Sequence, residues 1–215
     1  MYNTRGFLYK LQRKYGRFAI QNLMLYIVGA MGAIYVIDML VPLNLYGMLM
    51  FHWGLIVQGE VWRIFTFIFL PPLANPIFIV FALYLYWMIG TGLEAQWGAF
   101  RLNAFYFIGM LGTIAGGFIT GFATNFYLNL SLFLAFAILY PNFEIRLFFI
   151  LPVKMKWLAL VYLAFLVYDW FTVGFWHFRV AMLISVANVA LFFGRDFIGI
   201  IKRSYRRAKW RNNQR

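Results

Sequence analysis

The chain contains no cysteine, and its 215 residues include only six acidic residues and two histidines. The lack of cysteine excludes disulfide bonds and thiolate metal sites, and it leaves the redox compartment open. Charged residues make up 12% of the chain, half of the ~25% that is typical of a soluble domain. Together with apolar runs close to twenty residues long, this shortage of charge predicts a helical protein that crosses the membrane several times.

The few acidic residues leave a net charge of +13. Most basic residues lie in four places: the N-terminal arm, the region near Arg101, residues 144–156, and the tail from Arg195 onward. By the positive-inside rule these places, and with them both termini, are predicted to face the cytoplasm. There the basic residues would meet anionic lipid headgroups. Nucleic acid is not expected as a partner of the tail, because the orientation of the protein in the membrane is enough to explain basic residues next to its spans.

Six apolar segments are predicted to span the bilayer, at about residues 20–43, 65–89, 102–121, 126–140, 157–172 and 180–199. The chain is therefore expected to consist of a basic arm (1–18), a six-helix membrane domain (19–199) and a basic tail (200–215). The fourth segment would form only about 22 Å of helix at ~1.5 Å per residue, less than the ~30 Å of the hydrocarbon core. We expect it to lie inside the bundle, where the other helices shield it from lipid.

Prolines and glycines indicate where the helices start and how they pack. Pro71, Pro72 and Pro76 lie in the outer part of the second segment, so its regular helix is predicted to begin near Pro76. The connection at residues 44–62 is too apolar for a solvated loop and is expected in the outer membrane interface. Glycines recur every four residues in the third segment, which predicts close helix contact there: Gly112, Gly116, Gly117 and Gly121.

Polar residues at fixed offsets mark the two ends of the second segment. The first end reads GEVWRIFT at residues 59–66, and the second reads LEAQWGAFR at residues 93–101. A third motif, PVKMKW at residues 152–157, closes a stretch that begins at Pro141. This order of motifs resembles the rhomboid superfamily of membrane proteins, which includes intramembrane proteases and inactive relatives such as the derlins.

The resemblance implies a six-helix bundle with an interfacial first loop and a short central fourth helix, in a bacterial plasma membrane. It also implies structural roles for residues of the motifs: Trp62, Arg63, Glu94, Arg101, Pro141, Pro152 and Lys154. Trp62 and Arg63 are expected to anchor and brace the first loop, with Arg63 at the interface or paired with Glu60. Contact with a client is their less favoured role. Glu94 and Arg101 are expected to tie spans two and three together.

Proteolysis by rhomboids requires a serine in a Gly-x-Ser-Gly motif on the fourth helix and a histidine base on the sixth. No Gly-x-Ser-Gly occurs in this chain. The family's spacing before Pro141 places Phe126 at the nucleophile position, and the pattern of the sixth helix places Met182 at the base position. Phenylalanine has no nucleophilic atom, and a methionine thioether cannot accept a proton at neutral pH. The resemblance therefore predicts a rhomboid pseudoprotease and not an enzyme.

Two other functions remain open. An active protease would need a displaced dyad of Ser131 and His177. Ser131, however, lies about five residues deeper than the expected nucleophile, and we expect its hydroxyl to bond a backbone carbonyl. A small-solute transporter or channel would use intramembrane polar residues, and Asp38, Asp169 and Asn188 are the candidates. The lack of internal repeats argues against a transporter.

As a pseudoprotease, the protein is expected to bind transmembrane segments of client proteins and to thin the bilayer around its short helices. Four asparagines are candidate polar contacts for a client: Asn75, Asn125, Asn129 and Asn188. Asn75 lies in the region where active rhomboids bind the oxyanion. No cofactor and no metal is expected, and the sequence leaves the client and the oligomeric state open.

Overall fold

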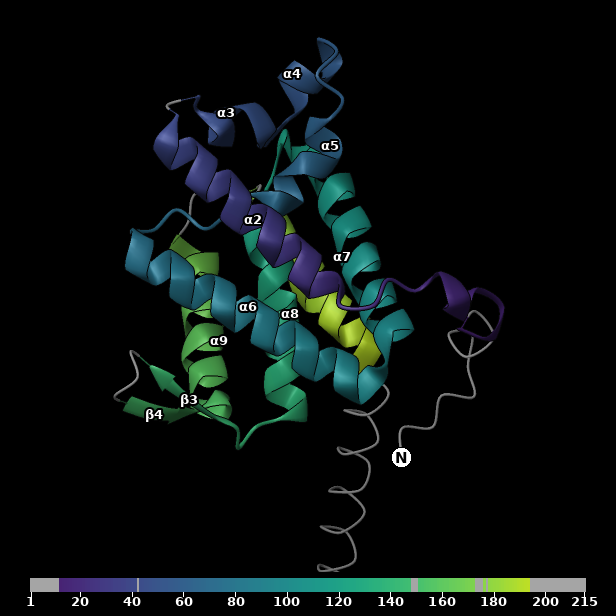
Figure 1. Ribbon diagram of the computed structural model, residues 1–215, viewed down its shortest axis with the longest axis vertical. Coiled ribbons are helices and arrows are strands. Elements are labelled where there is room, and N and C mark those ends of the chain that lie inside the picture. The colour runs from purple at the N-terminus through teal and green to yellow at the C-terminus, as the bar shows by residue number, and fades with distance from the viewer. Residues whose placement is uncertain (1–11, 42, 148–150, 173–175, 177, 194–215) are drawn as a thin grey trace, which may run out of the picture.

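The computed structural model describes residues 12–41, 43–147, 151–172, 176 and 178–193. Over these residues the chain is mostly helical, and four helical segments are long and apolar enough to cross a membrane (Figure 1): Gln12–Leu40, Pro76–Trp97, Ala99–Thr120 and Met155–Thr172. The first of these is interrupted before Leu23, where its long helix begins. Two shorter apolar helices, Phe126–Leu139 and Phe178–Phe193, accompany them. The helical, apolar character predicted from composition is therefore confirmed, and it identifies an integral membrane protein.

The helix at the second span starts where its prolines predict. Helix α6 (Pro76–Trp97) begins at Pro76, and the side chain of Asn75 accepts a hydrogen bond from the amide of Phe78 at 3.1 Å. This is an N-cap followed by proline at the first helical position, the most favourable chemistry for a helix start. The helix extends past residue 89, where the predicted span ends. The helix continues to Trp97 and ends at Gly98, whose φ of +80° is rarely adopted by other residues.

Helix α8 (Phe126–Leu139) lies at the centre of the bundle, as predicted from its length. Most of its side chains are buried. Figure 1 shows it behind α6, with α9 (Met155–Thr172) on one side and α7 (Ala99–Thr120) on the other. Helix α2 (Leu23–Leu40) packs against α6. The helix Phe178–Phe193, here called the final helix, begins close to the predicted start of the sixth span. Residues 194–199 of that span lie outside the described residues.

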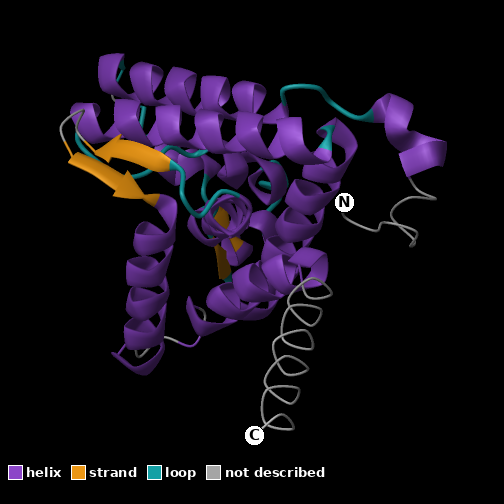
Figure 2. Ribbon diagram, turned by 90° about the horizontal axis from the view of Figure 1, so that it is seen from below, coloured by secondary structure: helices purple, strands orange, loops and turns teal. Residues whose placement is uncertain are grey.

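Two short strand pairs were not part of the helical prediction (Figure 2). Strand β1 (Phe51–His52) pairs antiparallel with β2 (Phe122–Ala123), which joins the first loop to the connection between α7 and α8. Strand β3 (Glu144–Leu147) pairs antiparallel with β4 (Leu151–Lys154) in a hairpin directly before α9. Pairing satisfies backbone groups that an unpaired strand would leave without partners near the membrane.

The connection after α2 is built from short helices at the end of the bundle opposite the hairpin (Figure 1). It contains α3 (Leu45–Leu49), α4 (Trp53–Val57), α5 (Arg63–Thr66) and the 3-10 turn Phe67–Phe69. Several of its large apolar side chains are exposed, including Trp53 and Val57. This arrangement is typical of a segment that lies at a membrane interface.

Glycines on α7 allow the final helix to approach closely. A Cβ atom on Gly116 would lie 2.5 Å from Cδ1 of Ile184, and one on Gly109 would lie 2.5 Å from Nδ2 of Asn188. Both distances are far shorter than van der Waals contact. The small-residue face predicted on this span is therefore the surface on which the final helix packs, and Gly117 instead faces Phe51 of the first loop.

Candidate functional site

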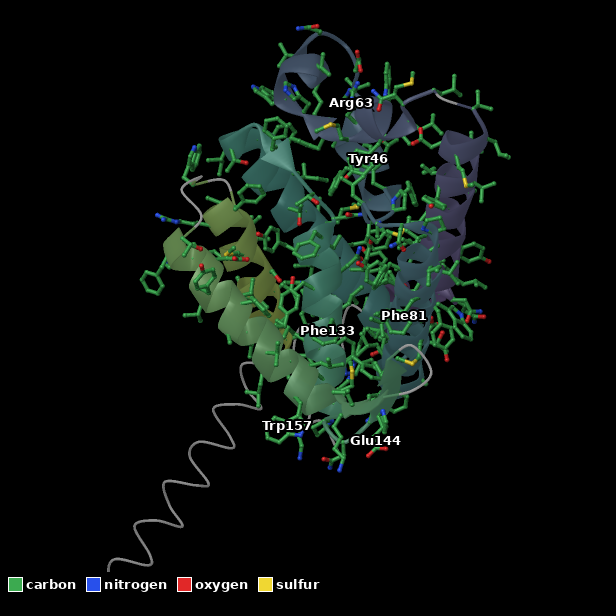
Figure 3. All side chains as sticks on the ribbon, turned by 90° about the vertical axis from the view of Figure 1, so that its left-hand side faces the viewer. Tyr46, Arg63, Phe81, Phe133, Glu144 and Trp157 are labelled. Carbon is green, nitrogen blue, oxygen red and sulfur yellow. The ribbon has the colours of Figure 1, made fainter. Side chains whose placement is uncertain are left out.

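Arg63 forms the polar centre of the first loop. Its side chain is almost fully buried, with 4% of the residue exposed. Its Nε donates to Oε2 of Glu60 at 2.6 Å, and its Nη1 donates to the carbonyls of Gly47 at 2.6 Å and Met50 at 3.0 Å. Arg63 was expected either to extend to the membrane interface or to pair with Glu60, and the structure shows the pair with Glu60. The interactions hold α3 and α5 together (Figure 3).

The neighbours of Arg63 complete a cap on α3. Trp62 donates from Nε1 to the carbonyl of Met48 at 3.3 Å, and Thr66 donates from Oγ1 to the carbonyl of Leu49 at 2.9 Å. With the bonds from Arg63, every carbonyl from Gly47 to Met50 accepts a side-chain hydrogen bond. The last carbonyls of a helix have no intrahelical partners, and a cation there also opposes the negative end of the helix dipole. The Trp-Arg-x-x-Thr motif thus braces the loop.

Tyr46, also on α3, lies beside this cap (Figure 3). Burial raises the pKa of its hydroxyl above the ordinary value of 10.0. An uncharged phenol is favoured in such a site because desolvation penalises the phenolate. The hydroxyl therefore stays protonated throughout the physiological pH range.

Glu94 connects α6 to the first span. Its Oε1 accepts a hydrogen bond from the backbone amide of Asn22 at 2.9 Å. Asn22 precedes α2 and has a left-handed backbone with φ of 54°. Glu94 thus ties the end of α6 to the start of span one, and satisfies one of the amides that a helix start leaves without a partner. Arg101 lies in the first turns of α7 and is partly buried.

Pro141, Pro152 and Lys154 lie around the start of α9. The carbonyl of Pro141 accepts from the amide of Lys156 at 3.1 Å, which holds the first turn of α9 against the start of the connection after α8. Pro152 lies opposite Arg146 in the β3–β4 hairpin. Nζ of Lys154 lies 3.7 Å from Oε1 of Glu144 in an exposed ion pair. All three residues therefore belong to the structure that positions α9.

Two of the four candidate asparagines have local structural partners. Asn75 is exposed and caps α6, so its side-chain oxygen is already used by the amide of Phe78. Asn125 donates from Nδ2 to the carbonyls of Ile68 at 3.1 Å and Leu70 at 2.7 Å. These bonds join the start of α8 to the segment before α6. Neither residue lines a cavity that the structure describes.

Ser131 has no free hydroxyl for nucleophilic attack. The residue is fully buried, and its Oγ donates to the carbonyl of Leu128 at 2.7 Å, as expected from the sequence. The same Oγ accepts from Nδ2 of Asn188 at 3.2 Å. A general base would have to occupy a position that these two partners fill. His177, the other half of the hypothetical displaced dyad, lies outside the described residues.

In liposomes with a rhomboid model substrate, we expect no cleavage product from this chain above that of protein-free liposomes. An active rhomboid in parallel liposomes serves as the positive control. Ser131→Ala should match the unsubstituted chain, because the hydroxyl proton is committed to the carbonyl of Leu128. Cleavage by the chain that is lost in Ser131→Ala or His177→Ala would identify an enzyme and contradict the expectation.

Phe126 and Met182, at the expected nucleophile and base positions, lie in apolar surroundings. Phe126 starts α8 and is 48% exposed. Its ring centroid lies 6.3 Å from that of Tyr162 on α9. Met182 is buried in the final helix and lines a small cavity with Leu166 and Trp170 of α9. Neither position offers a group that can transfer a proton.

A cavity of about 470 Å³ lies between α6, α8 and α9. Its walls are mostly apolar: Leu85, Tyr86, Ile89, Phe126, Asn129, Leu130, Phe133, Leu158, Val161, Tyr162 and Phe165. Phe133, on the α8 wall, is labelled in Figure 3. Asn129 is buried, and its Oδ1 has no hydrogen-bond partner within the described part of the chain. The sequence does not indicate Tyr86 and Tyr162 as cavity residues, because tyrosines are scattered throughout the apolar segments.

The candidate transporter residues do not form one site. Asp38, at the end of α2, accepts a hydrogen bond from the amide of Leu45 at 2.7 Å and so holds the start of α3. Asn188 is buried against Ser131 and the carbonyl of Phe105. Asp169 lies on α9 and is half-buried. Among the residues that the structure describes, no group of three or more His, Asp or Glu residues is close enough to hold a metal.

Comparison of the sequence with models of protein families finds no match, and comparison with curated proteins finds none either.

Proposed function

We propose that this chain is a catalytically inactive, rhomboid-like membrane protein that binds transmembrane segments of client proteins at the cavity between α6, α8 and α9. The cavity itself carries the proposal. Its lining is almost entirely apolar, and Val161 and Phe165 at its edge are more than half exposed. A side chain of a membrane-embedded helix can therefore reach it. At the position where the resemblance places a nucleophile, such a helix would meet the ring of Phe126.

Asn129 provides a polar contact for the client. Asn129 lines the cavity, and its buried Oδ1 has no hydrogen-bond partner among the described residues. A buried polar group without a partner costs about 1–3 kcal/mol. A client with a serine, threonine, asparagine or protonated acidic side chain at this depth would satisfy it, as polar residues do between membrane helices. The cavity thus favours client segments that are apolar with one polar residue.

Helix α9 is the wall best able to move. It is the least buried of the four long apolar helices, and only Met155 and Leu166 on it are buried. Helices with few buried contacts open at low free-energy cost. Displacement of α9 would widen the cavity without disturbing the contacts of α2, α6 and α7.

The proposal includes six spans, with both termini in the cytoplasm of a bacterium. The distribution of basic residues supports this orientation, and the short α8 supports local thinning of the bilayer around the protein. The motifs that resemble rhomboids support the bacterial plasma membrane as the location. The proposed partners are anionic lipids and transmembrane proteins, without a cofactor.

Site-specific photo-crosslinking in native membranes tests the proposal. A photoreactive phenylalanine analogue at Phe165, on the cavity edge, should give crosslinks to transmembrane proteins. The same analogue at Leu111, on α7, is the control, because Phe165 and Leu111 are equally exposed at 61% and 60%. Asn129→Leu should lower the yield from Phe165 about fivefold, the effect of losing ~1 kcal/mol of hydrogen bonding. Equal yields from the two positions would refute the proposal.

A further inference from the structure

A second, larger hollow lies on the other face of α9. Its volume is about 660 Å³, and its floor is formed by Leu134, Ala137 and Ile138 of α8. One wall belongs to α9 and the other to the final helix, with Val186, Val189 and Ala190. Every lining residue is apolar except Lys156, which lies at one end.

This hollow continues along the membrane. A smaller cavity of about 280 Å³ shares Leu163 and Val186 with it and extends to Trp170 and Phe171. Together they form an apolar groove along α9 from Lys156 to Phe171. At ~1.5 Å per residue its length is about 22 Å, more than the ~15 Å depth of one leaflet in a ~30 Å hydrocarbon core. The groove is therefore long enough for a lipid chain.

The end of the groove at Lys156 is positively charged. Lys156 is exposed, lies in the first turn of α9, and has no acidic residue in that turn. Its Nζ lies 5.8 Å from the ring centroid of Trp157, which marks this end of α9 in Figure 3. Lys154, two residues earlier, has Glu144 as its partner, whereas Lys156 makes no ion pair within the described ranges. The helix dipole adds further positive potential at this end.

We propose that the groove binds one acyl chain of an anionic phospholipid, with the lipid phosphate at Lys156. The apolar lining matches the chain, and the single cation at the end of the groove matches the headgroup. A second copy of this chain would bring another molecule of net charge +13 to the same place, where like charges repel. A transmembrane helix would fill the apolar part and leave Lys156 without a negative partner.

Native mass spectrometry of the full-length, delipidated protein with added lipid tests this site. Phosphatidylglycerol is the probe, and phosphatidylcholine with the same acyl chains is the neutral reference. We expect one phosphatidylglycerol to bind with higher affinity than phosphatidylcholine. Lys156→Gln should weaken its binding about fivefold, because one basic residue near the headgroup contributes ~1 kcal/mol. Lys14→Gln removes the same charge from another exposed lysine and should change the affinity less than twofold.

A second pair of variants tests the groove independently of charge. Ala190→Phe places a ring inside the groove and should abolish the tightly bound lipid. Ala187→Phe adds the same ring to an exposed position of the same helix that lines none of the described cavities, and it should leave binding unchanged. Equal weakening in Lys156→Gln and Lys14→Gln, or equal affinity for the two lipids, would overturn the proposal. A retained protein dimer or a co-purified helix that Ala190→Phe displaces would also overturn it.

Discussion

Gly109→Ala should lower the free energy of unfolding by about 2–4 kcal/mol. The new Cβ would lie 2.5 Å from Nδ2 of Asn188 and 2.6 Å from Cδ1 of Leu128. The amide of Asn188 cannot move away freely, because it donates to Ser131 and to the carbonyl of Phe105. The expected loss combines overpacking, ~1–3 kcal/mol, with a weakened buried hydrogen bond, ~1 kcal/mol. Unfolding in mixed micelles with increasing dodecyl sulfate measures it.

Gly29→Ala is the matched control, and its effect should have the opposite sign. Gly29 lies inside α2, and a Cβ there would meet nothing within 4 Å. Alanine is more favourable than glycine in a helix by up to ~1 kcal/mol, so this variant should unfold at a slightly higher dodecyl sulfate concentration. If Gly109→Ala were as stable as the unsubstituted chain, the close packing of α7 against the final helix would be contradicted.

Arg63→Ala should destabilise the protein by about 3 kcal/mol or more. The change removes the partner of Glu60 and leaves the carbonyls of Gly47 and Met50 without their side-chain donor. Breaking a buried charged pair costs about 3–5 kcal/mol. The lower end applies here because the side chain of Glu60 is 33% exposed. The same unfolding measurement, with tryptophan fluorescence as the signal, reports the change.

Two further variants separate the geometry of Arg63 from its charge. Arg63→Lys keeps the positive charge but replaces the planar guanidinium with a single ammonium group, which cannot bond Glu60 and both carbonyls together. It should therefore retain only part of the stability that Arg63→Ala loses. Lys154→Ala breaks the exposed pair with Glu144 and should cost less than ~1 kcal/mol, as surface pairs do. Full recovery by lysine would show that the charge alone matters, which the hydrogen-bond pattern does not predict.

Local chemistry made several parts of the structure predictable from sequence. Pro76 after Asn75 specifies a helix start through a cap and a fixed φ, and both effects operate within four residues. The central position of α8 followed from its length, because a short apolar helix cannot cover the hydrocarbon core alone. The glycines of α7 predicted a close contact, although not which helix would fill it.

The remainder depends on contacts between distant parts of the chain. Pairing of Phe51–His52 with Phe122–Ala123 joins residues about seventy positions apart, and such short strands have no periodicity to detect. The sequence does not predict which backbone amide Glu94 accepts from. The amide of Asn22 comes within reach only because α2 packs on α6. The cavities on both faces of α9 arise from the spacing between α9 and its neighbouring helices. That spacing cannot be predicted from individual residues in the sequence.

In capping α3, the Trp-Arg-x-x-Thr motif has a structural role that is independent of proteolysis. Each side chain of the motif satisfies a carbonyl of the first loop, and this requirement remains whether or not a nucleophile is present. A chain with phenylalanine at residue 126 therefore still needs Trp62, Arg63 and Thr66. This explains how rhomboid-like motifs and an inactive centre can coexist in the proposed pseudoprotease.

The glycine face of α7 also bears on the order in which the protein is made. Gly116 is covered by Ile184, so this surface stays open to lipid while more than sixty further residues are synthesised. At roughly 5–20 residues per second, that interval lasts several seconds. This face of the bundle is thus closed only after the helix Phe178–Phe193 has been made. A chain released before residue 178 would present a bare glycine surface, and this surface would distinguish an unfinished molecule from a complete one in the membrane.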